Sequence, residues 1–152
     1  MLAYRLVKAR HAATALDGEG ARRVGGRWNA PGLPVAYCAS SLSLAVLELL
    51  VHVDPAAVPE DLVAIRIEIP DGLPLRRLLP AELPDDWRRE SGRGRLRALG
   101  AAWLGARREA VLAVPSVIVP GETNLLVNPR HPDAARIRML APEPFTLDAR
   151  LF

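Results

Sequence analysis

The longest apolar stretch of this chain covers residues 42–53, twelve positions in which Glu48 is the only charged side chain. A membrane-spanning helix needs roughly 18 uninterrupted apolar residues, so this stretch, which Glu48 and His52 interrupt, is too short to cross a bilayer. Ser40 and Ser41 precede it and are typical N-cap residues. The helical spacing of its apolar side chains predicts a helix over about residues 42–52. The core-facing positions are expected to be Leu42, Ala45, Val46, Leu49, Leu50 and Val53.

The remaining apolar segments are short and favour β-strands. Residues 62–69 alternate in polarity, which is typical of a strand with one partly exposed face. A second helix is expected over residues 94–109, and one or two helical turns over residues 132–137. Several short strands with two main helices indicate an α+β fold. Further strands are expected at residues 1–7, 35–39, 111–119 and 123–127, an edge strand within 139–147, and an extended surface connection over 70–86.

The size and composition of the chain fit one globular domain. Its 152 residues are 50% apolar and 24% charged, and we expect residues 1–152 to form a single domain. The one cysteine, Cys38, cannot form an internal disulfide and suits a reducing compartment. Residues 1–6 lack the charged head and apolar stretch of a secretory signal. The sequence therefore predicts a soluble, cytoplasmic protein with no membrane partner.

The basic character of the chain comes from arginine. All basic residues except Lys8 are arginine, so a net charge of only +3 gives a pI of 9.7 without a strong field at pH 7. The densest basic stretch, residues 88–108, fits either a helix that faces nucleic acid or a solvated helix face. The solvated face is the better interpretation because no aromatic residues are interleaved for base stacking. A non-catalytic, arginine-rich nucleic-acid-binding module remains an alternative function.

Two common kinds of site are not predicted. The three histidines, His11, His52 and His131, are far apart in the sequence and have no cysteine at ligand spacing, so we expect no metal site. Gly20 and Gly25 have the spacing that opens a P-loop, but the Lys-Ser/Thr pair that should follow is absent.

A glycine-rich stretch over residues 17–34 is expected to be irregular, and long loops inside compact domains are more often functional than idle. It contains Gly25-Gly26-Arg27-Trp28-Asn29, in which an arginine and an indole follow two glycines. Backbone without side chains can approach a ligand closely, and a guanidinium offers a planar fork for phosphate. A turn with a surface arginine and a tryptophan in the core fits the same pattern equally well.

Three further residues are candidates for a site. Tyr37 is surrounded by small residues that leave room over its ring for a planar heterocycle, although a half-buried tyrosine is the simpler interpretation. Glu48 lies among apolar residues, where a carboxylate must be paired, protonated or functional, unless it reaches water at the edge of the apolar stripe. Ser116 follows Pro115 in an apolar strand, and nearby polar residues such as Asn124 fit local caps of a turn.

The order of these segments resembles the RES-domain family, the toxins of bacterial toxin–antitoxin pairs, which are named for Arg, Glu and Ser. No single motif is specific, but the ordered set spans residues 4–131. The matching stretches are Tyr4-Arg5, Gly25-Gly26-Arg27-Trp28-Asn29 with Gly32, Val35-Ala36-Tyr37, Ser43-Leu44-Ala45 with Glu48, Pro115-Ser116, and Glu122-Thr123-Asn124 followed by Asn128-Pro129 and His131.

This resemblance implies a fold related to ADP-ribosyltransferases, a mixed β core with flanking helices and a cleft for NAD⁺. It implies that NAD⁺ is the substrate, without a prosthetic group, and that the nicotinamide–ribose bond is cleaved by water or by inorganic phosphate. The implied partner is a helix-turn-helix antitoxin of the Xre type, and direct binding of nucleic acid by this chain is not expected. The implied catalytic residues are Arg27, Tyr37, Glu48 and Ser116, and the implied substrate-binding residues are Arg5, Gly26, Trp28, Asn29 and Asn124.

The residue types fit this chemistry. Cleavage of the nicotinamide–ribose bond builds positive charge on the ribose, and a fixed carboxylate such as Glu48 stabilises that charge. On the implied assignment Arg27, helped by Arg5, clamps the pyrophosphate, Tyr37 stacks on nicotinamide, and Ser116 bonds the ribose or the carboxamide. An ADP-ribosyltransferase that modifies a protein or nucleic acid is the alternative on the same fold.

Overall fold

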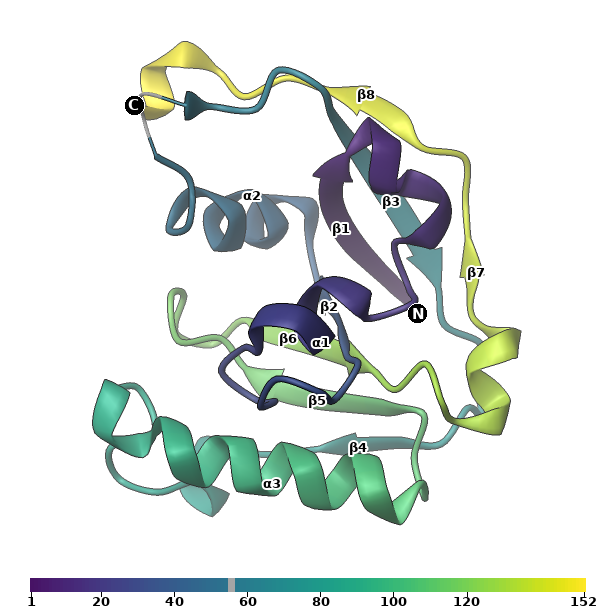
Figure 1. The fold of residues 1–152 in the computed structure, drawn as a ribbon, viewed down its shortest axis with the longest axis vertical. Helices are drawn as coiled ribbons and strands as arrows, with labels where there is room; N and C mark the ends of the chain where they lie inside the picture. Colours follow the sequence, from purple (N-terminus) through teal and green to yellow (C-terminus); the bar gives the residue numbers. More distant parts are fainter. Residues whose placement is uncertain (55–56) are drawn as a thin grey trace.

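The computed structural model describes residues 1–54 and 57–152 and is drawn in Figure 1. Within these residues eight strands form one sheet in the order β4-β5-β6-β2-β1-β3-β7, and β8 pairs with β3. β4 and β5 are parallel and the other pairs are antiparallel. The predicted α+β class is confirmed. The strands are β1 (Leu2–Lys8), β2 (Ala36–Ala39), β3 (Leu62–Glu68), β4 (Leu75–Arg77), β5 (Val111–Pro115), β6 (Thr123–Val127), β7 (Arg138–Met139) and β8 (Glu143–Phe145).

Three α-helices and several 3₁₀ turns join these strands in the described part of the chain. No helix among the described residues is long and apolar enough to cross a membrane. The α-helices are α1 (Glu19–Val24), α2 (Leu42–Leu50) and α3 (Arg93–Ala106); the 3₁₀ turns are η1 (Ala9–Thr14), η3 (Pro80–Glu82), η4 (Glu90–Gly92), η5 (Pro132–Arg136) and η6 (Ala149–Leu151).

The predicted helix after Ser41 is confirmed as α2. The Ser41 side chain accepts a hydrogen bond from the Leu44 backbone N–H at 3.1 Å, which satisfies one of the free donors of the first turn. Of the two buried residues of α2, Ala45 was among the expected core-facing positions and Leu44 was not. They pack on Ala39 of β2, so α2 covers the sheet through the first half of the helix.

Two predictions for irregular segments are corrected by the structure. Residues 17–34 contain the short helix α1, which ends at Gly25 with a φ of 74° that favours glycine. Residues 70–86 contain β4, which pairs with β5 from Leu75 opposite Val111. The prolines that favoured a surface connection flank this strand, where a strand at the edge of a sheet tolerates them.

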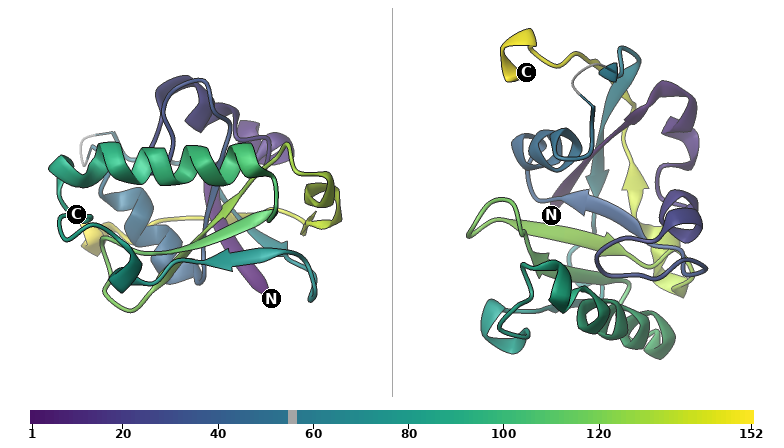
Figure 2. Two further views of the ribbon diagram at one scale, coloured as in Figure 1. Left: turned by 90° about the horizontal axis from the view of Figure 1, so that it is seen from below. Right: turned by 60° about the vertical axis from the view of Figure 1, so that its left-hand side comes forward.

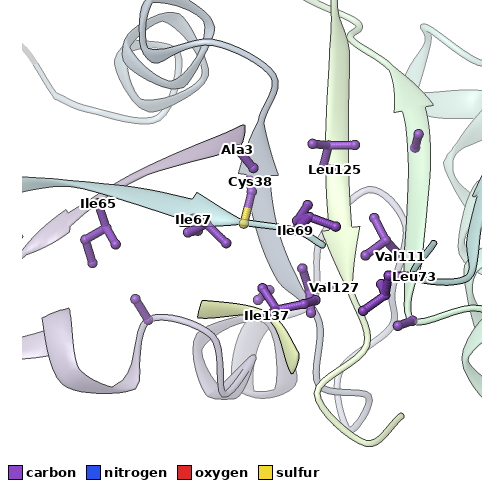
Figure 3. Packing of buried hydrophobic residues seen from close by; sticks show 14 residues of the cluster. Ala3, Cys38, Ile65, Ile67, Ile69, Leu73, Val111, Leu125, Val127 and Ile137 are labelled. Carbon is purple, nitrogen blue, oxygen red and sulfur yellow. The ribbon is translucent and has the colours of Figure 1, made fainter. Parts of the chain in front are cut away.

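Side chains of the sheet form a core on each of its two faces. Figure 3 shows one core, in which the sulfur of Cys38 lies among Ala3, Ile67 and Ile69. On the opposite face Trp28 and Leu126 pack with Leu96 and Trp103 of α3. Figure 2 shows α3 lying across the sheet. The second predicted helix is therefore confirmed as α3, with Leu96 and Trp103 among its buried residues.

The sheet divides between β1 and β2. These two strands share a single residue pair, Tyr4 opposite Ala39, whereas β1 and β3 pair along their whole length, from Leu2 opposite Glu68 to Lys8 opposite Leu62. β1 and β2 therefore diverge on either side of this pair, as Figure 1 shows. Helix α2 contacts both strands, so it lies beside the point where they diverge.

Candidate active site

A pocket of about 200 Å³ lies between β1, β2 and α2, where the two strands diverge. Four of the residues implied by the family resemblance line it: Arg5, Tyr37, Glu48 and Asn124. They come from β1, β2, α2 and β6, so the fold gathers them from four separate segments. The other lining residues are Tyr4, Leu6, Cys38, Ala39, Ala45, Leu49 and His52.

The carboxylate of Glu48 is held by one of its two oxygens. Its Oε1 accepts hydrogen bonds from the Ser116 hydroxyl at 2.9 Å and from the Asn124 side-chain amide at 2.5 Å. Among the described residues no hydrogen bond reaches Oε2, and the half-buried side chain lines the pocket. The structure therefore fixes the orientation of this carboxylate and leaves one oxygen for a ligand.

Ser116 supports Glu48 and the loop between β5 and β6. Its hydroxyl donates to Glu48 and accepts from the backbone N–H groups of Ile118 and Val119, both at 3.1 Å. A hydroxyl has one donor and two acceptor positions, so all three are in use. Ser116 is 1% exposed and lies behind Glu48, outside the pocket lining. The hydrogen bond to a ribose or carboxamide that the resemblance implied stays a prediction.

The hydroxyl of Tyr37 holds the glycine-rich loop. It donates to the side-chain oxygen of Asn29 at 2.7 Å and accepts from the backbone N–H of Trp28 at 3.1 Å. Burial raises the pKa of Tyr37 to about 12, against the opposing effect of the hydrogen bond from Trp28 and the charges of Arg97 and Arg93. The hydroxyl therefore keeps its proton at neutral pH. Because the hydroxyl is bonded to the loop, the ring is the part of Tyr37 that is available to contact a ligand in the pocket.

Gly26 and Asn29 determine how this loop packs. A Cβ atom at Gly26 would lie 2.6 Å from the Tyr37 hydroxyl oxygen. Only glycine, which has no side chain, therefore lets the loop approach the Tyr37 hydroxyl this closely. Asn29 is completely buried, and its amide nitrogen donates to the backbone carbonyls of Ala21, Ala30 and Leu33. A direct contact between Asn29 and a dinucleotide would require these bonds to open.

Arg27 and Trp28 lie outside the pocket lining. The half-buried Arg27 donates from Nη1 to the Trp87 carbonyl at 3.2 Å. The ring of Trp28 is 3% exposed and packs in the core under α3, as in the alternative interpretation of a tryptophan in the core. The structure therefore brings Arg5, Tyr37, Glu48 and Asn124 together and leaves Arg27 outside the lining. Arg27 lies on the glycine-rich loop, whose next residue, Trp28, donates its backbone N–H to the Tyr37 hydroxyl.

Two residues near the site were not predicted from the sequence. His52 lines the pocket together with Glu48, which it follows by four residues, and it lies in the turn after α2 ends at Leu50. Arg97 donates from Nε to the Gly26 carbonyl at 2.9 Å, so the arginine-rich stretch is not a uniformly solvated helix face. The i,i+4 spacing could have indicated His52, whereas no local pattern distinguishes Arg97 from its neighbours.

A second, larger hollow of about 670 Å³ contains none of the predicted site residues. It is open and lies on the sheet face that carries Val127, with Arg22, Arg130 and His131 along its lining. Arg22 is already paired with Glu19. Among the described residues no group of three or more His, Cys, Asp or Glu side chains could hold a metal ion. We therefore assign the candidate active site to the smaller pocket, which both the held carboxylate of Glu48 and the side chain of Arg5 line.

Cys38 borders the pocket but is a poor nucleophile. Burial raises the pKa of its thiol to about 11, although Arg5 nearby lowers it in part. Thiols react as thiolates, so we expect the native protein to resist a disulfide-exchange reagent at pH 7.5 and to react faster as the pH approaches 11. Unfolding in guanidinium should expose one reactive thiol per chain. Rapid modification of the native protein at pH 7.5 would contradict this assignment.

The comparison with known proteins identifies the family. A sequence profile described as the RES domain matches residues 2–148. This chain belongs to the RES-domain family. The resemblance drawn from the ordered motifs is thereby confirmed.

RES-domain relatives with similar sequences carry toxin names. The chain is 38% identical over 152 residues to Toxin Res of Yersinia enterocolitica, covering 99% of both proteins. It is 42% identical over 139 residues to the Prs ADP-ribosylating toxin of Sphingobium sp. strain YBL2, covering 90% of this chain and 86% of the relative. The chain is accordingly a toxin of the RES-domain family.

A solved structure shares this fold. The crystal structure of the MbcT–MbcA toxin–antitoxin complex of M. tuberculosis contains a chain that matches with a TM-score of 0.78 at 26% sequence identity. The match covers 95% of this RES-domain chain and 84% of the other chain. The sheet and helices that surround the candidate site therefore follow an architecture known from a toxin–antitoxin complex.

Proposed function

We propose that this RES-domain toxin cleaves the nicotinamide–ribose bond of NAD⁺. The observation that carries the proposal is the Glu48 carboxylate, which Ser116 and Asn124 hold through one oxygen while the side chain lines a pocket shared with Arg5. A fixed negative charge in a small, partly enclosed site is the group that a glycosidic cleavage needs.

The proposed mechanism follows from the charge that develops on the ribose. When the bond to nicotinamide breaks, the ribose becomes oxocarbenium-like and the leaving nicotinamide becomes neutral. A carboxylate beside C1′ interacts more strongly with that cation than with the uncleaved ribose, so it lowers the barrier. Because Glu48 is already oriented by two hydrogen bonds, little reorganisation accompanies the reaction.

The other residues of the pocket would bind and orient NAD⁺. The Tyr37 ring offers an aromatic surface for nicotinamide, and its hydroxyl keeps the glycine-rich loop beside the pocket. Asn124 orients Glu48 directly. Arg5 lines the pocket while donating to the Tyr37 carbonyl at 3.2 Å, and it would supply a positive charge for the phosphate nearest the pocket.

The direct test is the incubation of the purified chain with NAD⁺, with and without inorganic phosphate. We expect release of nicotinamide, which mass spectrometry detects together with the second product. Free ADP-ribose identifies water as the acceptor, and ADP-ribose 1″-phosphate identifies phosphate. Intact NAD⁺ under both conditions, with added cell lysate as well, would contradict the proposal.

ADP-ribosylation of a protein is the second candidate, because the Sphingobium relative is named an ADP-ribosylating toxin. Both reactions break the same bond and differ in the acceptor that attacks the ribose. The same incubation with lysate separates them, because a transferase leaves ADP-ribose attached to a macromolecule. Binding of nucleic acid without NAD⁺ consumption is the outcome that the arginine-rich alternative predicts.

We further propose that the chain arrests growth when expressed alone and that a helix-turn-helix antitoxin of the Xre type counteracts it. The support is the fold shared with a chain of the MbcT–MbcA toxin–antitoxin complex. Co-expression with the product of a neighbouring helix-turn-helix gene should restore growth and yield a complex that co-purifies.

A further inference from the structure

Half-buried arginines without a counter-charge are concentrated beside the candidate site. Among the described residues the half-buried arginines are Arg5, Arg27, Arg93 and Arg97. Arg93 pairs with Glu90 at 3.0 Å, whereas no ion pair joins the other three to a carboxylate in residues 1–54 and 57–152. A guanidinium that has lost part of its hydration without gaining a counter-charge favours an anionic ligand.

A single hydrogen bond to a backbone carbonyl anchors each of these three side chains. A guanidinium has five N–H donors in a planar fork, so each anchor leaves further donors for an anion and fixes the direction of the group. The anchors are Arg5 Nη1 to Tyr37 O at 3.2 Å, Arg27 Nη1 to Trp87 O at 3.2 Å and Arg97 Nε to Gly26 O at 2.9 Å.

Two of the three anchors lie beside Tyr37, and the third fixes Arg27 to the carbonyl of Trp87. Arg5 binds the Tyr37 carbonyl, and Arg97 binds the carbonyl of Gly26, whose α-carbon faces the Tyr37 hydroxyl. The charge of Arg97 lowers the pKa of Tyr37 against the effect of burial, which agrees with a guanidinium close to the phenol. Figure 1 shows that the beginning of α3 lies on the same side of the molecule as α2 and the β5–β6 loop. The glycine-rich loop thus lies between the pocket and Arg97.

The pocket is too small for a whole dinucleotide. Sites that enclose a drug-sized ligand have about 300–1,000 Å³, and the space beside Glu48 has about 200 Å³. It therefore accommodates the nicotinamide end, and the diphosphate has to leave the pocket. Leaving past Tyr37, it would meet the glycine-rich loop with Arg27 and Arg97.

We propose that Arg97 of α3 binds the diphosphate of the dinucleotide across the glycine-rich loop, beside Arg27, which the family resemblance already implies as the pyrophosphate clamp. This inference rests on the proposed function, because it assigns the phosphate subsite of the same substrate. It adds to the site a residue from the arginine-rich stretch, which the sequence indicated as a solvated helix face. Planar, oriented guanidinium groups are suited to adjacent phosphates because they bind two oxygens at once.

The test compares Arg97→Ala with Arg108→Ala, which removes the same charge from an exposed position just after α3. Isothermal titration with ADP measures diphosphate binding, and titration with nicotinamide riboside, which has no phosphate, probes the pocket alone. We expect Arg97→Ala to weaken ADP binding about ten- to hundredfold, the effect of losing a charge-assisted contact, and to leave nicotinamide riboside binding unchanged. Arg108→Ala should bind both compounds as the unaltered chain does.

The outcomes separate this inference from the proposed function. Unchanged ADP affinity in Arg97→Ala, or no ADP binding by the unaltered chain, would overturn the role of Arg97. Equal weakening of ADP and nicotinamide riboside would also overturn it, since that result means a loop support only. Failure of the unaltered chain to consume NAD⁺ would instead contradict the proposed function, because the ADP titration measures binding without turnover.

Discussion

A Glu48→Gln variant is expected to lose NAD⁺ consumption by at least about a hundredfold while it stays folded. Glutamine keeps the Oε1 atom that accepts from Ser116 and Asn124, so the two hydrogen bonds that orient this side chain are retained. The negative charge that would stabilise the ribose cation is lost, and removal of one preorganised electrostatic contact costs on the order of a hundredfold in rate. Nicotinamide release by the purified variant is the measurement.

The matched control is Glu60→Gln, which makes the same change at an exposed position away from the pocket lining. It should consume NAD⁺ at the rate of the unaltered chain. The thermal midpoint of both variants, measured by circular dichroism, should stay within a few degrees of the unaltered protein. Glu48→Gln with substantial activity would remove the carboxylate from the proposed mechanism.

Gly100→Ala should cause the largest loss of stability among the glycine-to-alanine substitutions of this chain. A Cβ atom at position 100 would lie 1.8 Å from the carbonyl oxygen of Trp28, which is backbone and cannot rotate away. Overpacking a core costs about 1–3 kcal/mol and at times more, and we expect at least about 3 kcal/mol here. In a protein of this size the thermal midpoint should fall by roughly 6–12 °C.

Gly94→Ala provides the control in the same helix. A Cβ at Gly94 would have no atom within 4 Å apart from those of its chain neighbours and the nearby backbone of its own helix. Alanine should therefore be neutral or stabilise α3 by up to about 1 kcal/mol through its helix propensity. The contrast between the two variants isolates the contact with Trp28 from helix propensity. Equal midpoints for Gly94→Ala and Gly100→Ala would show that α3 can move away from the glycine-rich loop at no cost.

The parts of the fold that the sequence predicted are those with strong local periodicity. Apolar spacing and the Ser41 cap predicted α2, and alternation predicted β3. The short strand β4 is defined by parallel pairing with β5, from Leu75 opposite Val111, a long-range contact with no local pattern. The buried face of α2 also differs in part from the predicted one. Leu44, rather than Leu42, is buried because β1 and β2 lie beneath that side of the helix.

The same distinction applies to the candidate site. Glu48 was detectable because it is the only charge in an apolar stretch, and the family resemblance indicated its companions. The arrangement was not detectable, since the partners of Glu48 lie 68 and 76 positions away. The resemblance pointed to Tyr37 and Asn29 as ligand contacts, and tertiary packing shows their polar atoms bonded to each other. Arg97 required the three-dimensional contact with Gly26.

The long separation between Glu48 and its two partners has a consequence for biosynthesis. A nascent chain that has just completed α2 lacks Ser116 and Asn124, so its acidic group has neither of the hydrogen bonds that orient it. The carboxylate acquires its geometry only when β5 and β6 have been translated and have joined the sheet beside β2. On the proposed mechanism, we therefore expect NAD⁺ cleavage only from chains translated and folded at least as far as Asn124.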